Sequence, residues 1–199
     1  MTKIKLCGLT RPEDIECANE LAPDFIGFVF YDKSKRYVSH KTAEELKSRL
    51  SDNIKAVGVF VDEDVKVIAQ LLDRGIIDIA QLHGNEDEEY IAGLQALSAK
   101  PVIKAFRISS EDDVKKAQVS CADLILLDSG AGSGEAFDWD MLKNVKRSYF
   151  LAGGLTPQNV SEALRTLSPY AVDVSSGIET DGVKDHKKMR DFVSLVRQS

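Results

Sequence analysis

The feature of this sequence that most restricts its fold is a regular alternation of short apolar segments and longer polar ones. Eight apolar segments of six to eight residues begin 22 to 29 residues apart along the 199-residue chain. They cover residues 3–8, 25–30, 54–60, 77–84, 102–107, 124–129, 149–154 and 171–177. Continuous apolar runs, such as Leu124–Leu127, are typical of strands covered on both faces, and so of a parallel sheet. Each interval has room for a turn, a helix and a second turn.

Eight strand–helix units predict an α/β fold of the single-domain (β/α)8 class, a TIM barrel over residues 1–199. The alternative is an open doubly wound sheet, which usually has about five or six strands. Several helix starts are marked by sequence. Capping-box pairs occur at Thr10–Glu13, Thr42–Glu45 and Asn85–Glu88, and Thr156 is followed by Pro157. We therefore expect helices to begin close to these positions.

Composition and charge indicate which classes of binding partner this chain lacks. The net charge is −6 and no stripe of basic residues is present, so we expect no nucleic-acid partner. Apolar runs stay well short of the ~20 residues that cross a bilayer, so no membrane partner is expected. The three cysteines have no metal or disulfide spacing, and no signal peptide is recognisable; both indicate the cytoplasm. We expect a monomer, since no loop is long or conspicuously apolar.

Chemically useful side chains gather at the predicted carboxyl ends of the strands, where barrels of this class carry their active sites. The first strand gives Cys7, the second leads to Arg36, the fourth gives His83 and the sixth gives Asp128. Each has an ordinary interpretation: an inert buried thiol, a solvated loop residue, a structural histidine and a turn residue. Together they are a candidate acid–base site with an arginine suited to a carboxylate. No second His or Cys lies at metal-ligand spacing, so we predict no metal.

Glycine-rich turns follow the sixth, seventh and eighth strands. Gly153 and Gly154 precede the helix start at Thr156, and Ser176 and Gly177 follow the last strand. Such turns, next to the positive end of a helix, are typical of phosphate sites, although tight turns alone could also require them. We therefore predict a phosphorylated small-molecule substrate, with Gly132 and Gly134 of the sixth loop closing over it.

Strand alternation also predicts a buried ion pair beneath this site. Lys5 and Cys7 share one face of the first strand. If that face points into the barrel, Lys5 needs a partner, because an unpaired buried charge is costly. Asp173 on the eighth strand is the candidate, since the first and last strands are neighbours in a closed barrel. We expect the two charged groups to lie within about 6 Å of each other if they form a pair.

The motifs, taken in order, resemble one family across nearly the whole chain. The blocks are KLCGLT, GFVFYDKSKRYV, GVFV, QLHG, LLDSGAGSGEAFDW, LAGGLTPQNV and AVDVSSGIE. They are similar to phosphoribosylanthranilate isomerases of tryptophan biosynthesis. The resemblance implies a (β/α)8 barrel, no metal and no cofactor. It also implies an Amadori rearrangement of N-(5-phosphoribosyl)anthranilate to 1-(2-carboxyphenylamino)-1-deoxyribulose 5-phosphate.

The resemblance further implies residue roles. Cys7 matches the family's general base, Asp128 its general acid and Arg36 the group that holds the anthranilate carboxylate. The phosphate contacts map onto Gly153, Gly154, Ser176 and Gly177, whereas Ser129 stands where the family usually has threonine. Two alternatives remain open at this point: another phosphosugar enzyme, such as an indole-glycerol-phosphate synthase or a ribulose-phosphate epimerase, and a non-catalytic phosphosugar-binding barrel. The epimerase would need metal-binding histidines, and the chain has only three histidines in all.

Overall fold

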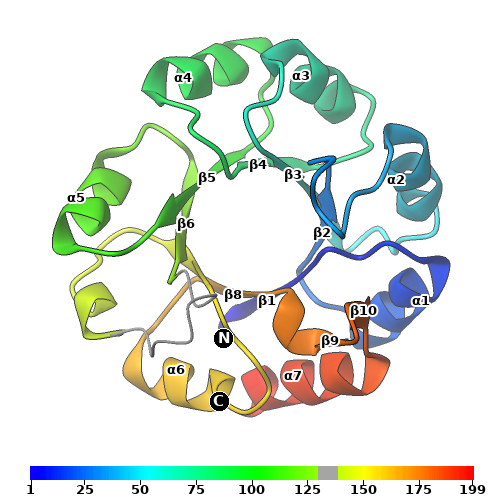
Figure 1. Ribbon diagram of the computed structural model, residues 1–199, viewed down its shortest axis with the longest axis vertical. Coiled ribbons are helices and arrows are strands. Elements are labelled where there is room, and N and C mark those ends of the chain that lie inside the picture. The colour runs from blue at the N-terminus through cyan, green and yellow to red at the C-terminus, as the bar shows by residue number, and fades with distance from the viewer. Residues whose placement is uncertain (130–138) are drawn as a thin grey trace.

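The strands form a closed parallel barrel, in the order in which they occur along the chain. The computed structural model describes residues 1–129 and 139–199. Each strand pairs in parallel with the next, and β1 with β8 closes the ring (Figure 1). The strands are β1 (Lys3–Cys7), β2 (Phe25–Val29), β3 (Lys55–Phe60), β4 (Ile79–Leu82), β5 (Val102–Arg107), β6 (Leu124–Asp128), β7 (Tyr149–Ala152) and β8 (Ala171–Val174). The predicted (β/α)8 barrel is confirmed, and the open sheet is wrong.

Helices surround the barrel and connect successive strands (Figure 1). They are α1 (Pro12–Leu21), α2 (His40–Lys47), α3 (Val65–Asp73), α4 (Glu88–Leu97), α5 (Glu111–Val119), α6 (Val160–Thr166) and α7 (His186–Gln198). A short 3-10 turn, η1 (Trp139–Leu142), is described between β6 and β7. A second one, η2 (Ser176–Ile178), follows β8 and leads into a small hairpin of β9 (Glu179–Thr180) and β10 (Val183–Lys184). None of the described helices is long and apolar enough to span a membrane.

Two apolar cores hold the fold together. The inner core fills the barrel toward the end where the strands begin. There the ring centroids of Phe25 and Phe150 lie 5.3 Å apart. The outer core lies between the strands and the helices, and Ile68, Leu71 and Leu72 of α3 belong to it. The alternation of strand side chains explains the division: successive residues face the barrel interior and the helices in turn. Both faces of every strand are therefore covered, as the apolar sequence runs predicted.

Helix starts differ from the predicted ones by a few residues. The side chains of Ser39 and Asp87 cap α2 and α4, and α1 follows Arg11, so the three capping-box predictions are wrong in position. Thr156 begins a turn, in which its N–H donates to Asn159 Oδ1, and α6 starts only at Val160. The loop geometry at each strand end, which the local sequence does not encode, decides which polar residue reaches the free N–H groups.

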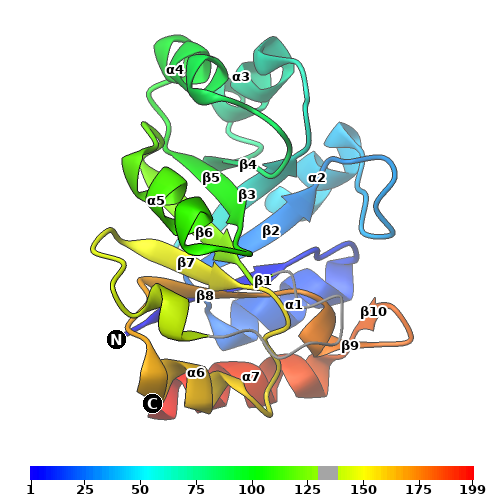
Figure 2. The ribbon, with the colours of Figure 1, turned by 60° about the vertical axis from the view of Figure 1, so that its left-hand side comes forward.

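The two chain ends lie near each other at the end of the barrel where the strands begin (Figure 2). Met1 and Ser199 both line a shallow hollow there. The carboxyl ends of the strands, with their connecting loops, form the opposite rim. Among the described residues, Cys7, Arg36, His83 and Asp128, which were predicted to carry chemistry, lie on that rim.

Candidate active site

A cavity of about 880 Å³ opens at the carboxyl end of the barrel. Each of the eight strands contributes at least one side chain to its lining: Cys7, Val29, Val59, Gln81, Ala105, Asp128, Ala152 and Asp173. The apolar members are small, which leaves room for a ligand above them. The functional members are a thiol, an amide and two carboxyl groups. This side of the barrel faces the loops that carry the other predicted site residues.

Cys7 is buried at the end of β1, and Gly27 of β2 makes room for it. A Cβ atom added to Gly27 would lie 2.7 Å from the Cys7 sulfur. Burial raises the pKa of the Cys7 thiol above its ordinary value, and Asp173 adds to the rise. Lys5 and Lys184 oppose it, but their effect on the pKa is smaller than that of burial. A thiol that acts as a general base must ionise, which a lowered pKa favours. The ligand-free protein does not lower it, because burial outweighs the effect of the two lysines, each of which is paired with a carboxylate.

The predicted pair beneath the cavity is confirmed. Lys5 Nζ lies 2.9 Å from Asp173 Oδ2, and the two residues are directly opposite each other in the β1–β8 register. Lys5 is fully buried. Burial alone would lower its pKa, but the charges of Asp173 and Cys7 and the hydrogen bonds to them together outweigh this and raise the pKa of Lys5 above the usual lysine value. The second carboxylate oxygen, Asp173 Oδ1, is buried and accepts no hydrogen bond from any described residue.

Asp128 and His83 meet across the cavity. Asp128 Oδ2 lies 3.6 Å from His83 Nε2, and both side chains are partly exposed to the cavity. Gln81 Nε2 lies 3.0 Å from His83 Nδ1. Since an amide N–H can only donate, Nδ1 accepts, and the proton of a neutral imidazole is then on Nε2, which faces Asp128. The amide oxygen of Gln81 is buried without a hydrogen bond from the described residues.

Arg36 lines the cavity, as predicted, and is held from behind by two residues that the sequence analysis did not identify. Its Nε and Nη2 atoms donate to the two carboxylate oxygens of Glu179, at 2.6 and 2.7 Å. Lys184 Nζ donates to Glu179 Oε1 at 2.6 Å. Glu179 occurs in the quoted AVDVSSGIE block, which was the available signal. Lys184 has none, because only the hairpin brings it to this place.

The turns after β7 and β8 form the far side of the cavity. Gly153, Gly154 and Ser176 line it, whereas Gly177 faces the loop after β7 and leaves no room for a Cβ beside the Leu155 carbonyl. Both Gly153 and Gly154 have positive φ angles, of 92° and 64°. These turns therefore expose backbone to the cavity and also require glycine for their conformation.

Three further features of the sequence concern this site. Ser129, the departure from the family pattern, donates its hydroxyl hydrogen to the Gly153 carbonyl at 2.9 Å, which ties the sixth loop to the seventh. Gly132 and Gly134 lie outside the described residues. Arg107, which was not among the predicted site residues, also lines the cavity at the end of β5.

Comparisons with known proteins agree with this site. The family model of N-(5'-phosphoribosyl)anthranilate (PRA) isomerase matches residues 4–195. An N-(5'-phosphoribosyl)anthranilate isomerase from Caldanaerobacter subterraneus subsp. tengcongensis is 48% identical over 204 residues, covering 99% of this chain and 98% of that protein.

Solved structures agree as well. The phosphoribosyl anthranilate isomerase of Thermotoga maritima has a TM-score of 0.91 at 37% identity, covering 100% of both chains; another structure of that isomerase describes it as dimeric. An isomerase in complex with reduced 1-(o-carboxyphenylamino)-1-deoxyribulose 5-phosphate has a TM-score of 0.89 at 36% identity, again covering 100% of both chains. The chain therefore belongs to the N-(5'-phosphoribosyl)anthranilate isomerase family.

Proposed function

We propose that this chain performs the family's Amadori rearrangement with Asp128 as general acid and Cys7 as general base. Membership of the family gives the reaction and its place in tryptophan biosynthesis. The observation that carries the residue roles is the cavity lining, where one thiol and one carboxyl group stand three strands apart around the ring and face the same space. A sugar lying between them has one face toward each group.

The chemistry follows from these two positions. Asp128, in its acid form, gives a proton to the ribose ring oxygen, and the C1–O bond breaks to leave a Schiff base. Cys7, as thiolate, then removes the proton from C2, and the electron pair forms an enolamine. Tautomerisation of the enolamine gives the ketone product. General acid and base groups of this kind each contribute roughly 10²–10⁴-fold in rate.

The two ends of the substrate fit the two ends of the cavity. Arg36 suits the anthranilate carboxylate, because a guanidinium can donate two parallel hydrogen bonds to it. The phosphate suits the turns that contain Gly153, Gly154 and Ser176, where backbone N–H groups can approach an anion closely. Gly177 contributes by letting the turn after β8 approach the loop after β7 closely. The relative solved with a reduced product analogue supports this class of ligand.

Three further residues complete the proposed site. We assign His83 to substrate positioning, because its imidazole lies between Gln81 and Asp128 at the cavity wall. Gly132 and Gly134 remain proposed contacts on the loop after β6. We propose no metal or cofactor for this reaction, since the ring opening and the tautomerisation that follows need only proton donors and acceptors.

The test is to remove each group separately. Asp128→Asn and Cys7→Ser should each lower kcat by at least about a hundredfold while the far-UV circular dichroism stays unchanged. The loss of phosphoribosylanthranilate fluorescence measures turnover. Near-normal kcat in either folded variant rules out the role given to that residue. A wild-type protein that binds the phosphosugar without turnover would instead be a binding protein.

We also propose a monomeric, cytoplasmic protein. The three cysteines are all free, with Cys7 and Cys17 buried and Cys121 exposed, which suits a reducing compartment. Light scattering coupled to gel filtration gives the mass in solution. A mass near twice the 21.9 kDa of one chain would contradict the monomer.

A further inference from the structure

We propose that Glu179, anchored by Lys184, is a positioning residue that holds the Arg36 guanidinium in place for the aromatic carboxylate of the substrate. The inference rests on the carboxylate-binding role proposed above for Arg36. It assigns to the β9–β10 hairpin a task in substrate selection that nothing in the cavity lining itself reveals.

Arg36 makes a bidentate contact with Glu179 that uses only one edge of its guanidinium group. Glu179 accepts hydrogen bonds from the Nε and Nη2 atoms, which form one edge of the planar guanidinium. The other edge, formed by Nη1 and the second Nη2 hydrogen, has the same two-donor geometry. No acceptor among the described residues bonds to Nη1. One edge is therefore clamped, and the other is available to a second carboxylate.

Glu179 is itself fixed by the hairpin. Its side chain is only 8% exposed, and its Oε1 also accepts from Lys184 Nζ. Lys184 is buried, and the same ammonium donates to the Ser175 carbonyl at 2.9 Å, so it is tied to the end of β8. Burial alone would raise the pKa of Glu179, but the hydrogen bonds from Arg36 and Lys184 outweigh this and keep its pKa below the ordinary value. The carboxylate stays charged at neutral pH.

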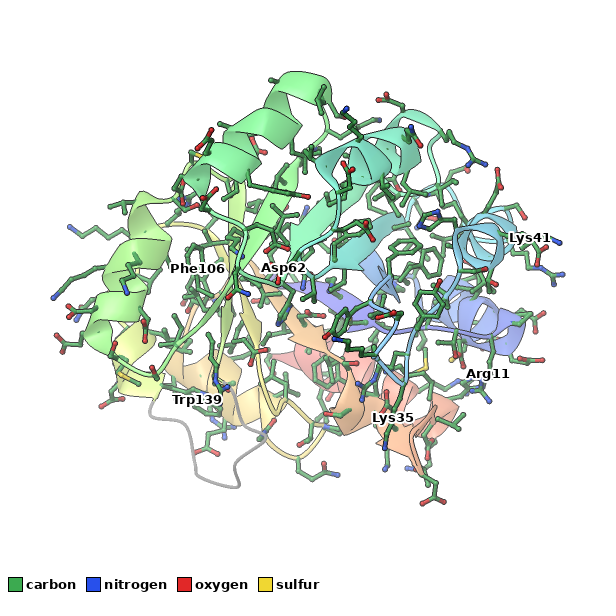
Figure 3. The ribbon with its side chains drawn as sticks, turned by 45° about the horizontal axis from the view of Figure 1, so that its top comes forward. Arg11, Lys35, Lys41, Asp62, Phe106 and Trp139 are labelled. Carbon is green, nitrogen blue, oxygen red and sulfur yellow. The ribbon has the colours of Figure 1, made fainter. Side chains whose placement is uncertain are left out.

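The rest of the Arg36 side chain has little else to restrain its charged end. Its methylene stem crosses Gly8, where an added Cβ would lie 2.5 Å from Arg36 Cδ, and its backbone N–H donates to Ser34. Gly8 also has a positive φ of 77°, so a side chain there would be strained as well as in the way of the stem. Figure 3 shows the loop after β2, marked by Lys35, beside the β9–β10 hairpin.

Clamping an arginine before the substrate arrives has a direct consequence for binding. A free arginine side chain loses rotamer freedom when it binds a ligand, and this opposes association. The clamp removes that loss in advance and leaves the other edge of the guanidinium, on an arginine that lines the cavity, available to the ligand. Its effect should therefore be on affinity for a carboxylated substrate and not on the chemical step.

The experiment compares Glu179→Gln with wild type on two substrates: phosphoribosylanthranilate, and N-(5-phosphoribosyl)aniline, which lacks the carboxylate. The glutamine oxygen can still accept from Lys184, whereas its NH₂ group faces an arginine donor, so the change acts on the clamp. We expect KM for the carboxylated substrate to rise roughly threefold to tenfold, with kcat within about twofold. The kcat/KM for the aniline substrate should stay at the wild-type value.

Two controls separate the clamp from folding and from the proposed function. The aniline substrate reports on folding, because a damaged barrel would lose both activities together. In an Arg36→Met background, Glu179→Gln should add no further rise in KM, since the clamped group is gone.

The opposing outcomes are distinct. An unchanged KM in Glu179→Gln would overturn the clamp, and so would an equal loss of kcat/KM on both substrates. Tighter binding of the carboxylated substrate would also overturn it, because Glu179 would then compete with the substrate for Arg36. A wild-type protein that does not convert phosphoribosylanthranilate would refute the proposed function, and the clamp with it.

Discussion

Lys5 and Asp173 form an ion pair inside the barrel, directly beneath the cavity, and Lys5→Met breaks it. Lys5 is 0% exposed and Asp173 8% exposed, and the charged atoms are 2.9 Å apart. The methionine fills a similar volume but leaves the Asp173 carboxylate without its cation, while Oδ1 already accepts nothing from the described residues. Breaking such a pair costs about 3–5 kcal/mol. In a chain of this size that lowers Tm by roughly 6–20 °C.

Urea unfolding at pH 7.5, followed by circular dichroism, measures the cost. Asp173→Asn should be similarly harmful, because it leaves Lys5 buried and unpaired. The double variant Lys5→Met/Asp173→Asn leaves no unpaired charge, so its cost should be about 2 kcal/mol or more below the sum of the two single costs. A Lys5→Met cost under about 1 kcal/mol, or a strictly additive double variant, would refute the reasoning.

The pair also has a predicted pH range. The pKa of Lys5 is raised in the folded protein, so its contribution to stability is fully present below the unfolded lysine value of about 10.4. The contribution is lost as the pH rises through the still higher folded value. The Lys5→Met cost should therefore be the same at pH 6.5 and pH 8.5. Lys5 also lowers the pKa of Cys7, so the variant should react more slowly with iodoacetamide at Cys7, as peptide mass spectrometry measures at fixed pH.

Two further predictions concern the thiol. Gly27→Ala places a methyl group 2.7 Å from the Cys7 sulfur and should lower kcat at least about tenfold, whereas Gly93→Ala, in the open on α4, should leave steady-state turnover unchanged. Equal activity of the two variants would remove the steric argument. Because burial raises the pKa of Cys7 and the thiolate is the base, kcat/KM should rise with pH through a value above the usual thiol pKa of about 8.5. A pH–rate profile that reaches its plateau below pH 8 would contradict this.

The barrel itself was predictable because its signal repeats. Each of the eight apolar segments begins within two residues of the start of an observed strand and ends within three residues of its end. Closure then placed Lys5 beside Asp173 without any knowledge of coordinates, since β1 and β8 must pair when the ring closes. The positions of Cys7 and Asp128 on one rim followed in the same way.

Contacts made between loops were not predictable, because no local pattern encodes them. Lys184 lies five residues after Glu179 in an ordinary charged stretch, and only a hairpin with Asp181 at positive φ folds it back onto that carboxylate. The predicted helix starts were wrong for a related reason. Asp62, labelled in Figure 3, stands close before α3 in the sequence, but it accepts a hydrogen bond from Asn85 in the loop after β4, and it is Asp64 that caps α3.

The pairing of charges around Cys7 explains how the two proton transfers can differ. Lys5 is paired with Asp173, and Lys184 shares the Glu179 carboxylate with Arg36, and the lowering that the two lysines exert on the pKa of the thiol is smaller than the effect of burial. The effect of burial on the thiol therefore prevails over that of the lysines, and the raised pKa keeps Cys7 protonated near neutral pH. The substrate brings a carboxylate and a phosphate, and added negative charge favours the protonated form of a neighbouring carboxyl group. We therefore expect substrate binding to assist the acid step at Asp128 and to oppose ionisation of Cys7. Proton removal from C2 should then be the slower of the two, and a substrate deuterated at C2 should show a primary isotope effect on kcat; its absence would place the limiting step elsewhere.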